Sequence, residues 1–398
     1  MRRAPVIFAL AVSIGMVGSA RAQTPALPAP FSPAVVAGDF VYLAGMLPTD
    51  TNGKIVAGDV RTQTTRALDN LAGLLKQHGS RMEQVAAVTV YLKNQSDFGA
   101  MNEVYGKYWP KDPPTRTTVT ANLVVPDALI EISMVALRDG VERRIIHPPS
   151  WLRSPSPYSY GIQSKNTLFL SGLVSRNGKD NTAVPGDMKT QAGTVLENAR
   201  EILAAAGMTL ADVVSSRVYI TDTALFQDMN TVYRTGFPAN PPVRATVKTG
   251  LTAPQYLVEI TMLAVKDAPR NVLSTPNADG TPGKPNPVLS SAIRVGDRLF
   301  LSGMLGSTVS NKGDAAAQTR ETLARIGRTL EAAGFDWADV VDSVVYLPDL
   351  KTFGAMNLAY REAFGGRFPA RATVEAGLVA PDGLVEIMMT AARSGGKR

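Results

Sequence analysis

Three arginine–glutamate pairs recur along the 398-residue sequence at identical spacing. Each arginine stands two residues after a proline, and each glutamate follows its arginine by fifteen positions. The pairs are Arg116 with Glu131, Arg244 with Glu259, and Arg371 with Glu386. A guanidinium group is a planar fork that can bind a carboxylate through two parallel hydrogen bonds. The spacing therefore indicates either three sites for a small carboxylate-bearing molecule or three ion pairs that hold parts of the chain together, and both remain open.

Other side chains that commonly do chemistry are scarce. The chain has no cysteine, which excludes disulfides, thiol nucleophiles and thiolate metal sites. Its two histidines, His78 and His147, have no counterparts in the repeats described below, which is more typical of solvent-facing residues than of ligands or general bases. We therefore expect no metal site and no cofactor.

The arginine–glutamate pairs belong to a threefold repeat of about 127 residues. Each copy carries an apolar segment that ends in glycine (41–45, 168–172 and 299–303). Each also carries an asparagine followed three positions later by a tyrosine; these pairs are Asn102 and Tyr105, Asn230 and Tyr233, and Asn357 and Tyr360. A repeat of this length is a small domain in its own right. Proline-rich segments separate the copies, so we expect repeats at 23–138, 158–266 and 288–398, joined by linkers at 139–157 and 267–287.

Hydrophobic periodicity predicts an α+β fold, with one β-β-α-β-α-β-β unit in each repeat and the helices on one face of a sheet. The expected elements of the first repeat are strands 40–46, 85–92, 115–121 and 129–137, a helix from Val60 to Leu75, and a second helix capped by Asp97.

We expect the last two strands to form a hairpin in which Arg116 lies opposite Glu131. On that register Arg116, Thr118 and Glu131 share a face with Val135 and Leu137. The face under the helices then holds Val119, Ile130, Ile132, Met134 and Ala136. A sheet that is apolar on both faces needs cover on both. The three sheets should therefore pack face to face as a closed pseudo-trimer within one chain.

The first 22 residues have the pattern of an export signal. Arg2 and Arg3 precede an apolar run at 6–18, and a small-residue site ends at Ala22. The run is shorter than the roughly 20 residues of a membrane-spanning helix, so cleavage is favoured over the alternative of a retained anchor. We expect a periplasmic or secreted protein that does not bind membranes after cleavage. The formal charge of +7 falls by three on cleavage and is not gathered into runs, so nucleic-acid binding is not indicated.

These motifs together resemble the RidA family, also called YjgF, of imine and enamine deaminases. The resemblance covers nearly all of residues 28–394 in three copies, and the Pro-x-Arg segment is its most specific part. Family members are typically homotrimers of one such unit with ligand clefts between subunits. The resemblance therefore implies a monomeric chain that forms the equivalent of that trimer by itself.

The resemblance also implies roles for particular residues. The arginines would hold the carboxylate of a 2-imino acid, and the glutamates would position the water that converts it to a 2-keto acid and ammonia. Further contacts to the ligand are implied for the strand-end glycine and serine, for the helix asparagine, and for the threonine that stands where well-known members have cysteine. These residues are Gly45, Gly172, Gly303, Ser171, Ser302, Asn102, Asn230, Asn357, Thr118, Thr246 and Thr373.

The three clefts are expected to differ. The family's cleft tyrosine is present only as Tyr158, and Phe31 and Leu289 stand at the corresponding positions. The strand-end serine is Ala44 in the first repeat, which leaves the second repeat closest to the family pattern. Two other functions stay open: non-catalytic binding of small carboxylates or other metabolites in the periplasm, and, with weaker support, a nuclease or chaperone activity as claimed for some relatives.

Overall fold

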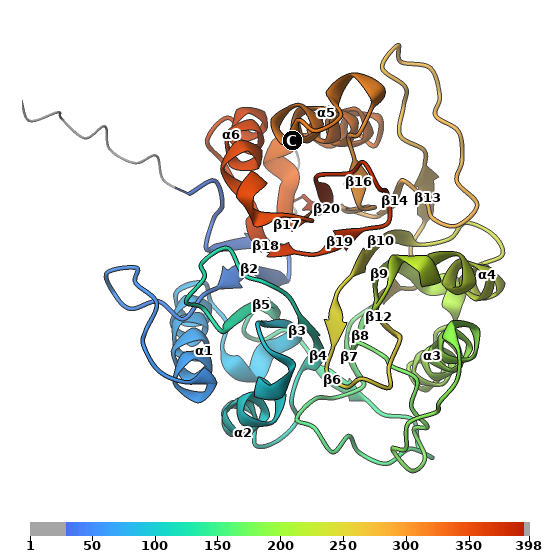
Figure 1. The fold of residues 1–398 in the computed structure, drawn as a ribbon. Helices are drawn as coiled ribbons and strands as arrows, with labels where there is room; N and C mark the ends of the chain where they lie inside the picture. Colours follow the sequence, from blue (N-terminus) through green and yellow to red (C-terminus); the bar gives the residue numbers. More distant parts are fainter. Residues whose placement is uncertain (1–28, 394–398) are drawn as a thin grey trace, which may run out of the picture.

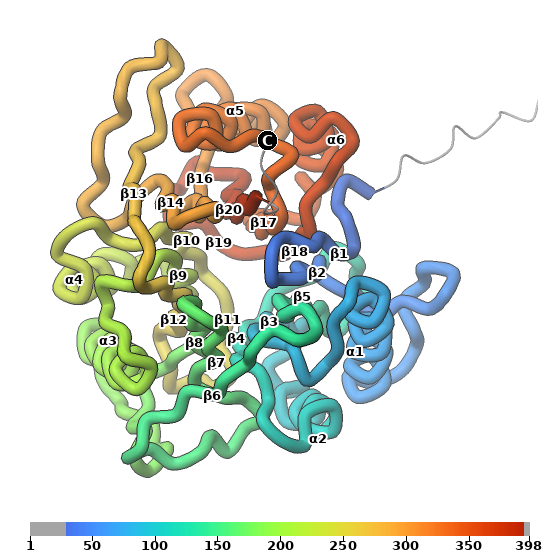
Figure 2. The backbone as a smooth tube through the Cα atoms, turned by 180° about the vertical axis from the view of Figure 1, so that it is seen from behind, coloured from blue at the N-terminus to red at the C-terminus, as the bar shows by residue number. Residues whose placement is uncertain are grey.

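Three similar lobes surround a common centre in the computed structural model, which describes residues 29–393 (Figure 1). The expected export signal at residues 1–22 lies outside the described residues. Each lobe is one repeat, with a sheet toward the centre and two long helices outside, and the view from behind shows the same arrangement (Figure 2). The α+β fold and the pseudo-trimer packing predicted from the sequence are confirmed.

The first repeat contains β1 (Ala34–Ala37), β2 (Phe40–Met46), α1 (Val60–Gln77), β3 (Val85–Leu92), α2 (Phe98–Tyr108), β4 (Thr115–Thr120) and β5 (Ile130–Leu137). The second contains β7 (Gly161–Ser164), β8 (Thr167–Leu170), α3 (Met188–Ala205), β9 (Val213–Ile220), α4 (Phe226–Gly236), β10 (Val243–Lys248), β11 (Gly250–Leu251) and β12 (Val258–Val265). The third contains β14 (Ala292–Val295), β15 (Arg298–Leu301), β16 (Met304–Leu305), α5 (Ala315–Ala332), β17 (Val340–Leu347), α6 (Phe353–Phe364), β18 (Ala370–Glu375), β19 (Gly377–Leu378) and β20 (Glu386–Ala392). The segments expected as linkers also contribute β6 (Arg144–Ile146) and β13 (Arg270–Leu273), which pair with β7 and β14.

The first helix of each repeat begins at a capping aspartate. The side chain of Asp59 accepts a hydrogen bond from the backbone N–H of Thr62, and Asp187 and Asp314 cap α3 and α5 in the same way. Asp97 does precede α2, but its carboxylate accepts from the side chain of Asn94 and makes no capping bond. The capped helices lay their apolar faces on the outer side of each sheet.

The expected hairpin between the last two strands is wrong, because β3 lies between them. The order in the first sheet is β1-β2-β5-β3-β4; β4 runs parallel to β3, and β5 runs antiparallel to it. The segment from β3 through α2 to β4 is a crossover connection, which produces parallel strands. The nine residues between β4 and β5 then carry the chain to the other side of β3.

This order places Arg116 and Glu131 on opposite faces of the sheet. Arg116 lies in one row with Val88 and Met134, on the face under the helices. Glu131 lies in one row with Tyr91 and Val119, on the face toward the centre. The expectation that Arg116, Thr118 and Glu131 share a face is therefore wrong, and Val119 belongs to the central core.

The sheets join one another around the pseudo-threefold axis. Strand β11 of the second repeat pairs with β4 of the first, and β19 of the third pairs with β10 of the second. A bridge between Leu123 and Val374 completes the ring. At the centre Tyr91, Tyr219 and Tyr346, one from each repeat, are fully buried.

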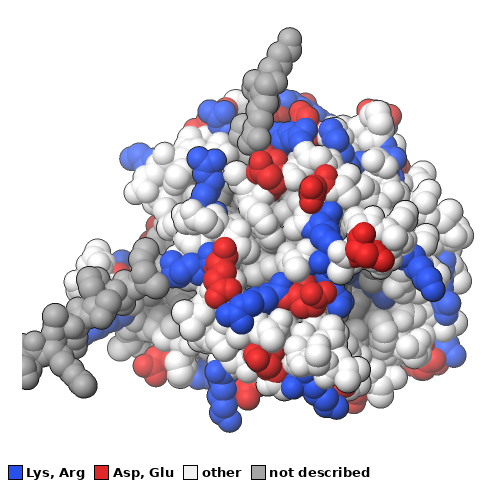
Figure 3. Space-filling model, turned by 90° about the horizontal axis from the view of Figure 1, so that it is seen from above, with Lys and Arg blue, Asp and Glu red and all other residues white. Residues whose placement is uncertain are grey.

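The outer surface mixes both signs of charge. On the face seen in Figure 3, lysine and arginine side chains alternate with aspartate and glutamate and form no broad patch of one sign. Within residues 29–393, no helix is long and apolar enough to cross a membrane.

Candidate functional site between repeats

Each cleft arginine lies beside the glutamate of the next repeat around the ring, not beside its own. The carboxylate of Glu259 accepts a hydrogen bond of 3.3 Å from the backbone N–H of Thr118, two residues after Arg116. The same relation joins Glu386 to Thr246 and Arg244, and Glu131 to Thr373 and Arg371. The three clefts are therefore formed by Arg116 with Glu259, Arg244 with Glu386, and Arg371 with Glu131.

The strand that carries each arginine is held to the neighbouring repeat through the backbone. The backbone N–H of Gly172 donates to the carbonyl of Arg116 at 3.0 Å, and that of Gly303 donates to the carbonyl of Arg244 at 3.1 Å. The hydroxyl of Ser171 accepts from the N–H of Arg116 at 2.9 Å, and Ser302 does the same for Arg244 at 2.8 Å. Ala44 cannot make this contact in the third cleft, so that cleft is built differently.

The three arginines are buried without an ion-pair partner. Their exposed fractions are 4% for Arg116, 2% for Arg244 and 5% for Arg371, and none forms an ion pair within 4 Å among residues 29–393. Each has a buried Nη1 atom with no hydrogen-bond partner. Burial lowers the pKa of all three, and desolvating an unpaired guanidinium is costly. These observations favour a ligand-binding role over the alternative of structural ion pairs.

Aromatic rings hold each guanidinium in place. The Cζ atom of Arg116 lies 4.7 Å from the ring centroid of Tyr105 and 5.6 Å from that of Phe98, both on α2. Arg244 contacts Tyr233 and Phe226 in the same manner, and Arg371 contacts Tyr360 and Phe353. These tyrosines belong to the repeat motif, but the sequence analysis gives them no role in the site. Their position three residues after the motif asparagine was the available signal.

Burial changes the ionisation of the glutamates. Glu131, Glu259 and Glu386 are 3–4% exposed, and desolvation raises the pKa of each to about 8. The threonine N–H and the arginine charge oppose this shift only in part. Near neutral pH a large share of each carboxyl group is therefore protonated and can donate a proton as well as accept one.

The strand-end glycines make room for these carboxyl groups. A Cβ atom on Gly172 would lie 1.9 Å from Oε1 of Glu259, and Gly45 and Gly303 stand in the same relation to Glu131 and Glu386. Any larger residue would displace the carboxyl group from its cleft. In this structure the glycine thus accommodates the glutamate of its own repeat, whereas the resemblance implied contact with the ligand.

The motif asparagines and threonines are partly buried or buried, and one asparagine contacts its cleft arginine directly. The Oδ1 atom of Asn357 accepts a hydrogen bond of 2.8 Å from Arg371, while the Oδ1 atoms of Asn102 and Asn230 are buried without a partner. The hydroxyl oxygens of Thr118, Thr246 and Thr373 are likewise buried and unpaired. Unpaired buried polar atoms around an unpaired arginine are typical of a site that receives a ligand.

The first cleft encloses a cavity of about 110 Å³. Its walls include Arg116, Thr118, Tyr158, Gly172 and Glu259, and the ring of Tyr158 lies 5.8 Å from the guanidinium carbon of Arg116. Arg176 and Tyr256 also line this cavity. Sequence reasoning missed this pair, because neither residue belongs to a recurring motif. Phe31 lies 5.8 Å from Arg371, so an aromatic ring occupies the tyrosine's place in the third cleft.

No metal site accompanies the clefts in the part of the chain that the structure describes. No group of three or more histidine, aspartate or glutamate side chains there is arranged to hold a metal ion. The polar groups present in each cleft are a guanidinium, a partly protonated carboxyl group, a backbone N–H and a threonine hydroxyl.

Comparison with known proteins agrees with this architecture. The family profile described as endoribonuclease L-PSP matches residues 21–138, 150–266 and 284–393. A RutC family protein of Pyrococcus abyssi is 39% identical over 111 residues, which are 28% of this chain and 87% of the relative. The 3-aminoacrylate deaminase RutC of Acinetobacter baylyi is 40% identical over 114 residues, 28% of this chain and 90% of the relative.

One solved structure matches almost the whole chain. A chorismatase covers 90% of this chain and 100% of its own, with a TM-score of 0.51 and 15% sequence identity. At that identity the similarity concerns the fold alone. The three profile matches and the curated relatives establish that the chain belongs to the endoribonuclease L-PSP family, the RidA family that its motifs resemble, and contains three tandem copies of the family's domain.

Proposed function

We propose that the protein hydrolyses small 2-imino or enamine acids to 2-keto acids and ammonia in the clefts between its repeats. The observation that carries the proposal is the buried guanidinium of Arg116, which has an unpaired Nη1 atom and belongs to a residue that lines the same cavity as Glu259. The name of the Acinetobacter baylyi relative, a 3-aminoacrylate deaminase, points to the same class of reaction.

The reaction needs little chemical assistance, because imines hydrolyse unaided. Arg116 binds the substrate carboxylate and fixes the imine carbon beside Glu259. Water adds to the carbon of the C=N bond, the C–N bond breaks, and ammonia leaves. Glu259 in its neutral form donates a proton toward the nitrogen, and its carboxylate then accepts a proton from the attacking water. The positive charge of the arginine stays available for the substrate, because no acidic side chain is paired with it.

The test uses 2-iminobutanoate made in solution by an amino-acid oxidase, with semicarbazide as the competing trap. Wild-type protein should lower the rate of semicarbazone formation, and the variant Arg116→Met/Arg244→Met/Arg371→Met should not. Methionine has a similar length and removes an unpaired charge, so the variant should fold. A matched control is Arg200→Met, which removes an exposed arginine on α3 and should retain full activity. Equal activity in the triple variant and the wild type would overturn the proposal.

The alternative is binding without turnover, which the differences among the clefts favour. Leu289 stands at the tyrosine position in one cleft, and Ala44 at the serine position in another. Calorimetry with 2-oxobutanoate separates the two functions. Saturable binding that the triple variant loses, in protein that does not accelerate imine loss, would establish a carboxylate-binding protein.

We also propose that the protein works in the periplasm or outside the cell, after cleavage following Ala22. The proposal rests on the pattern of the first 22 residues. Cell fractionation and N-terminal sequencing of the mature protein test it. An intact N-terminus in the cytoplasmic fraction would contradict it.

A further inference from the structure

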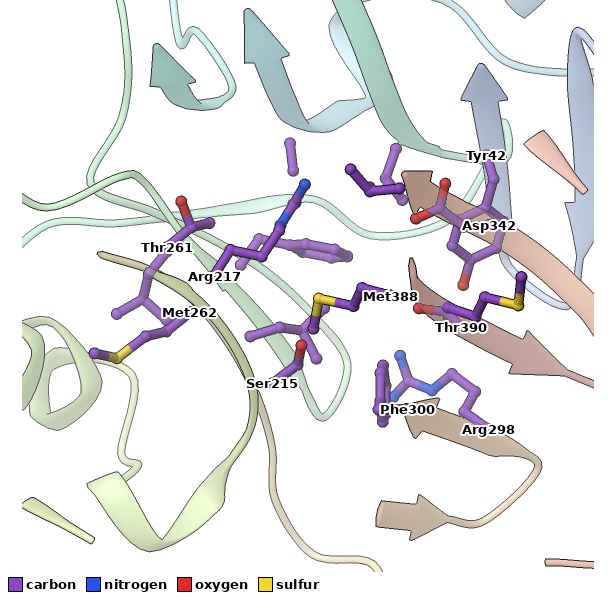
Figure 4. A pocket seen from close by; sticks show the side chains of 17 residues that line it. Tyr42, Ser215, Arg217, Thr261, Met262, Arg298, Phe300, Asp342, Met388 and Thr390 are labelled. Atoms are coloured by element: carbon purple, nitrogen blue, oxygen red, sulfur yellow. The ribbon is translucent and has the colours of Figure 1, made fainter. Parts of the chain in front are cut away.

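A second enclosed space lies on the pseudo-threefold axis, away from the three clefts. It has a volume of about 90 Å³ and is lined by inward-facing side chains from all three sheets (Figure 4). We call it the axial chamber and define it by Tyr42, Arg217, Phe300, Asp342 and Met388. At roughly 15 Å³ for each water-sized position, it has room for on the order of six non-hydrogen atoms. This is the size of a small metabolite.

The fold repeats three times, but the positions of Arg217 and Asp342 carry a charged residue in only one repeat each. The layer that holds Arg217 has Thr89 and Val344 at the equivalent positions of the other repeats. The layer below holds Asp342, with Ala87 and Ser215 as its equivalents. In each layer, two of the three equivalent positions thus hold uncharged residues. The charges are therefore not a requirement of the fold.

Arg217 is not held by a direct contact to another polar side chain in the part of the chain that the structure describes. Its guanidinium makes no hydrogen bond and no ion pair within 4 Å among the described residues. Asp342 projects from a different strand on the opposite side of the chamber (Figure 4). Burial raises the pKa of Asp342 to about 6, which the charge of Arg217 lowers only in part. Desolvation opposes the charge of Arg217, but its interactions with Tyr219, Tyr346, Tyr91 and Asp342 together outweigh desolvation and raise its pKa. The guanidinium is therefore charged and available to pair with an anion in the chamber.

A third charged residue lies between the chamber and the surface. The guanidinium carbon of Arg298 is 5.3 Å from the ring centroid of Phe40 and 5.6 Å from that of Phe300, and its Nη2 donates to the hydroxyl of Thr167 at 2.7 Å. Arg298 lines the chamber and also an outer hollow of about 300 Å³. The turns around Gly38, Lys165 and Gly296, one from each repeat, surround that hollow. Arg298 therefore forms part of the wall of both the axial chamber and the outer hollow.

We propose that the axial chamber binds a small monocarboxylate whose carboxylate pairs with Arg217. The fork of Arg217 matches a carboxylate, and Met388 and Val344 provide apolar contact for the rest of the molecule. Asp342 on the opposite wall repels a second acidic group, so dicarboxylates are disfavoured. This site is independent of the proposed hydrolysis in the clefts.

The test separates the chamber from the clefts by using the cleft-blocked variant Arg116→Met/Arg244→Met/Arg371→Met. Calorimetry of this full-length protein with pyruvate should show one binding site, and malonate should bind at least tenfold more weakly. Adding Arg217→Thr, the residue that the first repeat has at this position, should weaken pyruvate binding at least tenfold. Adding Arg200→Thr on the exposed face of α3 should leave binding unchanged. No pyruvate binding, or equal binding with Arg217→Thr, would overturn the proposal.

A second measurement does not depend on the cleft variants. A crystal of the wild-type protein soaked in pyruvate should show its carboxylate on Arg217. Water alone in the chamber, with pyruvate present in a cleft, would refute the axial site while supporting the cleft function. Imine hydrolysis by Arg217→Thr at the wild-type rate would show that the two sites work separately.

Discussion

At the scale of single residues, burial shifts the pKa of the glutamate and the pKa of the arginine in each cleft in opposite directions. It raises the pKa of Glu259 to about 8 and lowers the pKa of Arg116. Near neutral pH the arginine therefore carries the charge of the cleft, while much of the carboxyl population is neutral. A neutral carboxyl group does not compete with a substrate carboxylate for the guanidinium. The same residue is then available as a proton donor to the leaving nitrogen.

The raised pKa of the three glutamates predicts how stability depends on pH. In the unfolded chain these carboxyl groups ionise near pH 4.5, whereas in the folded protein they keep their protons to about pH 8. Folded protein thus binds more protons across this interval, and the free energy of unfolding must fall as the pH rises through it. Urea unfolding at pH 5.5 and 8.5 should show a loss of at least about 1 kcal/mol for each carboxyl group.

The matched control for this prediction is the variant Glu131→Gln/Glu259→Gln/Glu386→Gln. It keeps the shape of the side chains and removes their titration, so its stability should depend much less on pH. Asp342, whose pKa is also raised by burial, is present in both proteins and contributes equally to both. The same loss of stability in the variant and the wild type would show that these carboxyl groups are not buried in neutral form.

At the scale of helices and strands, the sequence predicted the positions of the elements well, but it predicted one strand pairing wrongly. Strands 40–46 and 85–92 have the predicted bounds, because alternating apolar residues and β-branched side chains depend on local sequence. The predicted hairpin between the last two strands is wrong, because these two strands are consecutive in sequence but not neighbours in the sheet. The β3–α2–β4 crossover required β4 to lie parallel to β3, and this rule was available from the sequence.

Serines that follow β8 and β15 tie two of the three arginine strands to the next repeat. The hydroxyl of Ser171 accepts from the N–H of Arg116 and donates to the carbonyl of Ser159 at 2.7 Å. Ser171→Ala leaves both backbone groups without this partner, so it should lower the free energy of unfolding by about 1–3 kcal/mol. Ser302→Ala should have a similar effect, because Ser302 bridges Arg244 and Ser290 in the same way.

The third cleft supplies the control for the serine prediction. Ala44 occupies the serine position beside Arg371, so Ala44→Gly removes a side chain there without removing a hydrogen bond. Urea unfolding should show a smaller loss for Ala44→Gly than for Ser171→Ala. A Ser171→Ala protein as stable as the wild type would show that water replaces the hydroxyl at this strand end.

At the scale of the whole molecule, each site is divided between two repeats, and this division could not be deduced from spacing within one repeat. The arginine, threonine and asparagine come from one copy, and the glutamate, glycine and serine come from the next. The complete family set, with Tyr158 and Ser171, therefore belongs to the cleft of Arg116, which the first and second repeats share. The sequence identified these residues and showed the second repeat to be closest to the family pattern, but it left open which repeats pair to form each cleft. The packing of the three repeats into a closed ring determines which arginine lies beside which glutamate.

Double substitutions test this division directly. Arg116→Met and Glu259→Gln affect one cleft, so the double variant should keep the same imine hydrolysis as the more impaired single variant. Arg116→Met and Glu131→Gln affect two different clefts, so their losses should add. If the three clefts were equally active, the first double variant would lose about one third of the rate and the second about two thirds.

The comparison holds even though the clefts differ, because each double variant is measured against its own single variants. Both pairs combine the same arginine with a glutamate of the same burial, so the chemical change is matched. Additive losses for Arg116 with Glu259, and shared losses for Arg116 with Glu131, would reverse the assignment and place each site within one repeat. Shared losses for Arg116 with Glu259, and additive losses for Arg116 with Glu131, require a ring in which no repeat has a complete site by itself. This requirement gives a physical reason for joining three copies in one chain.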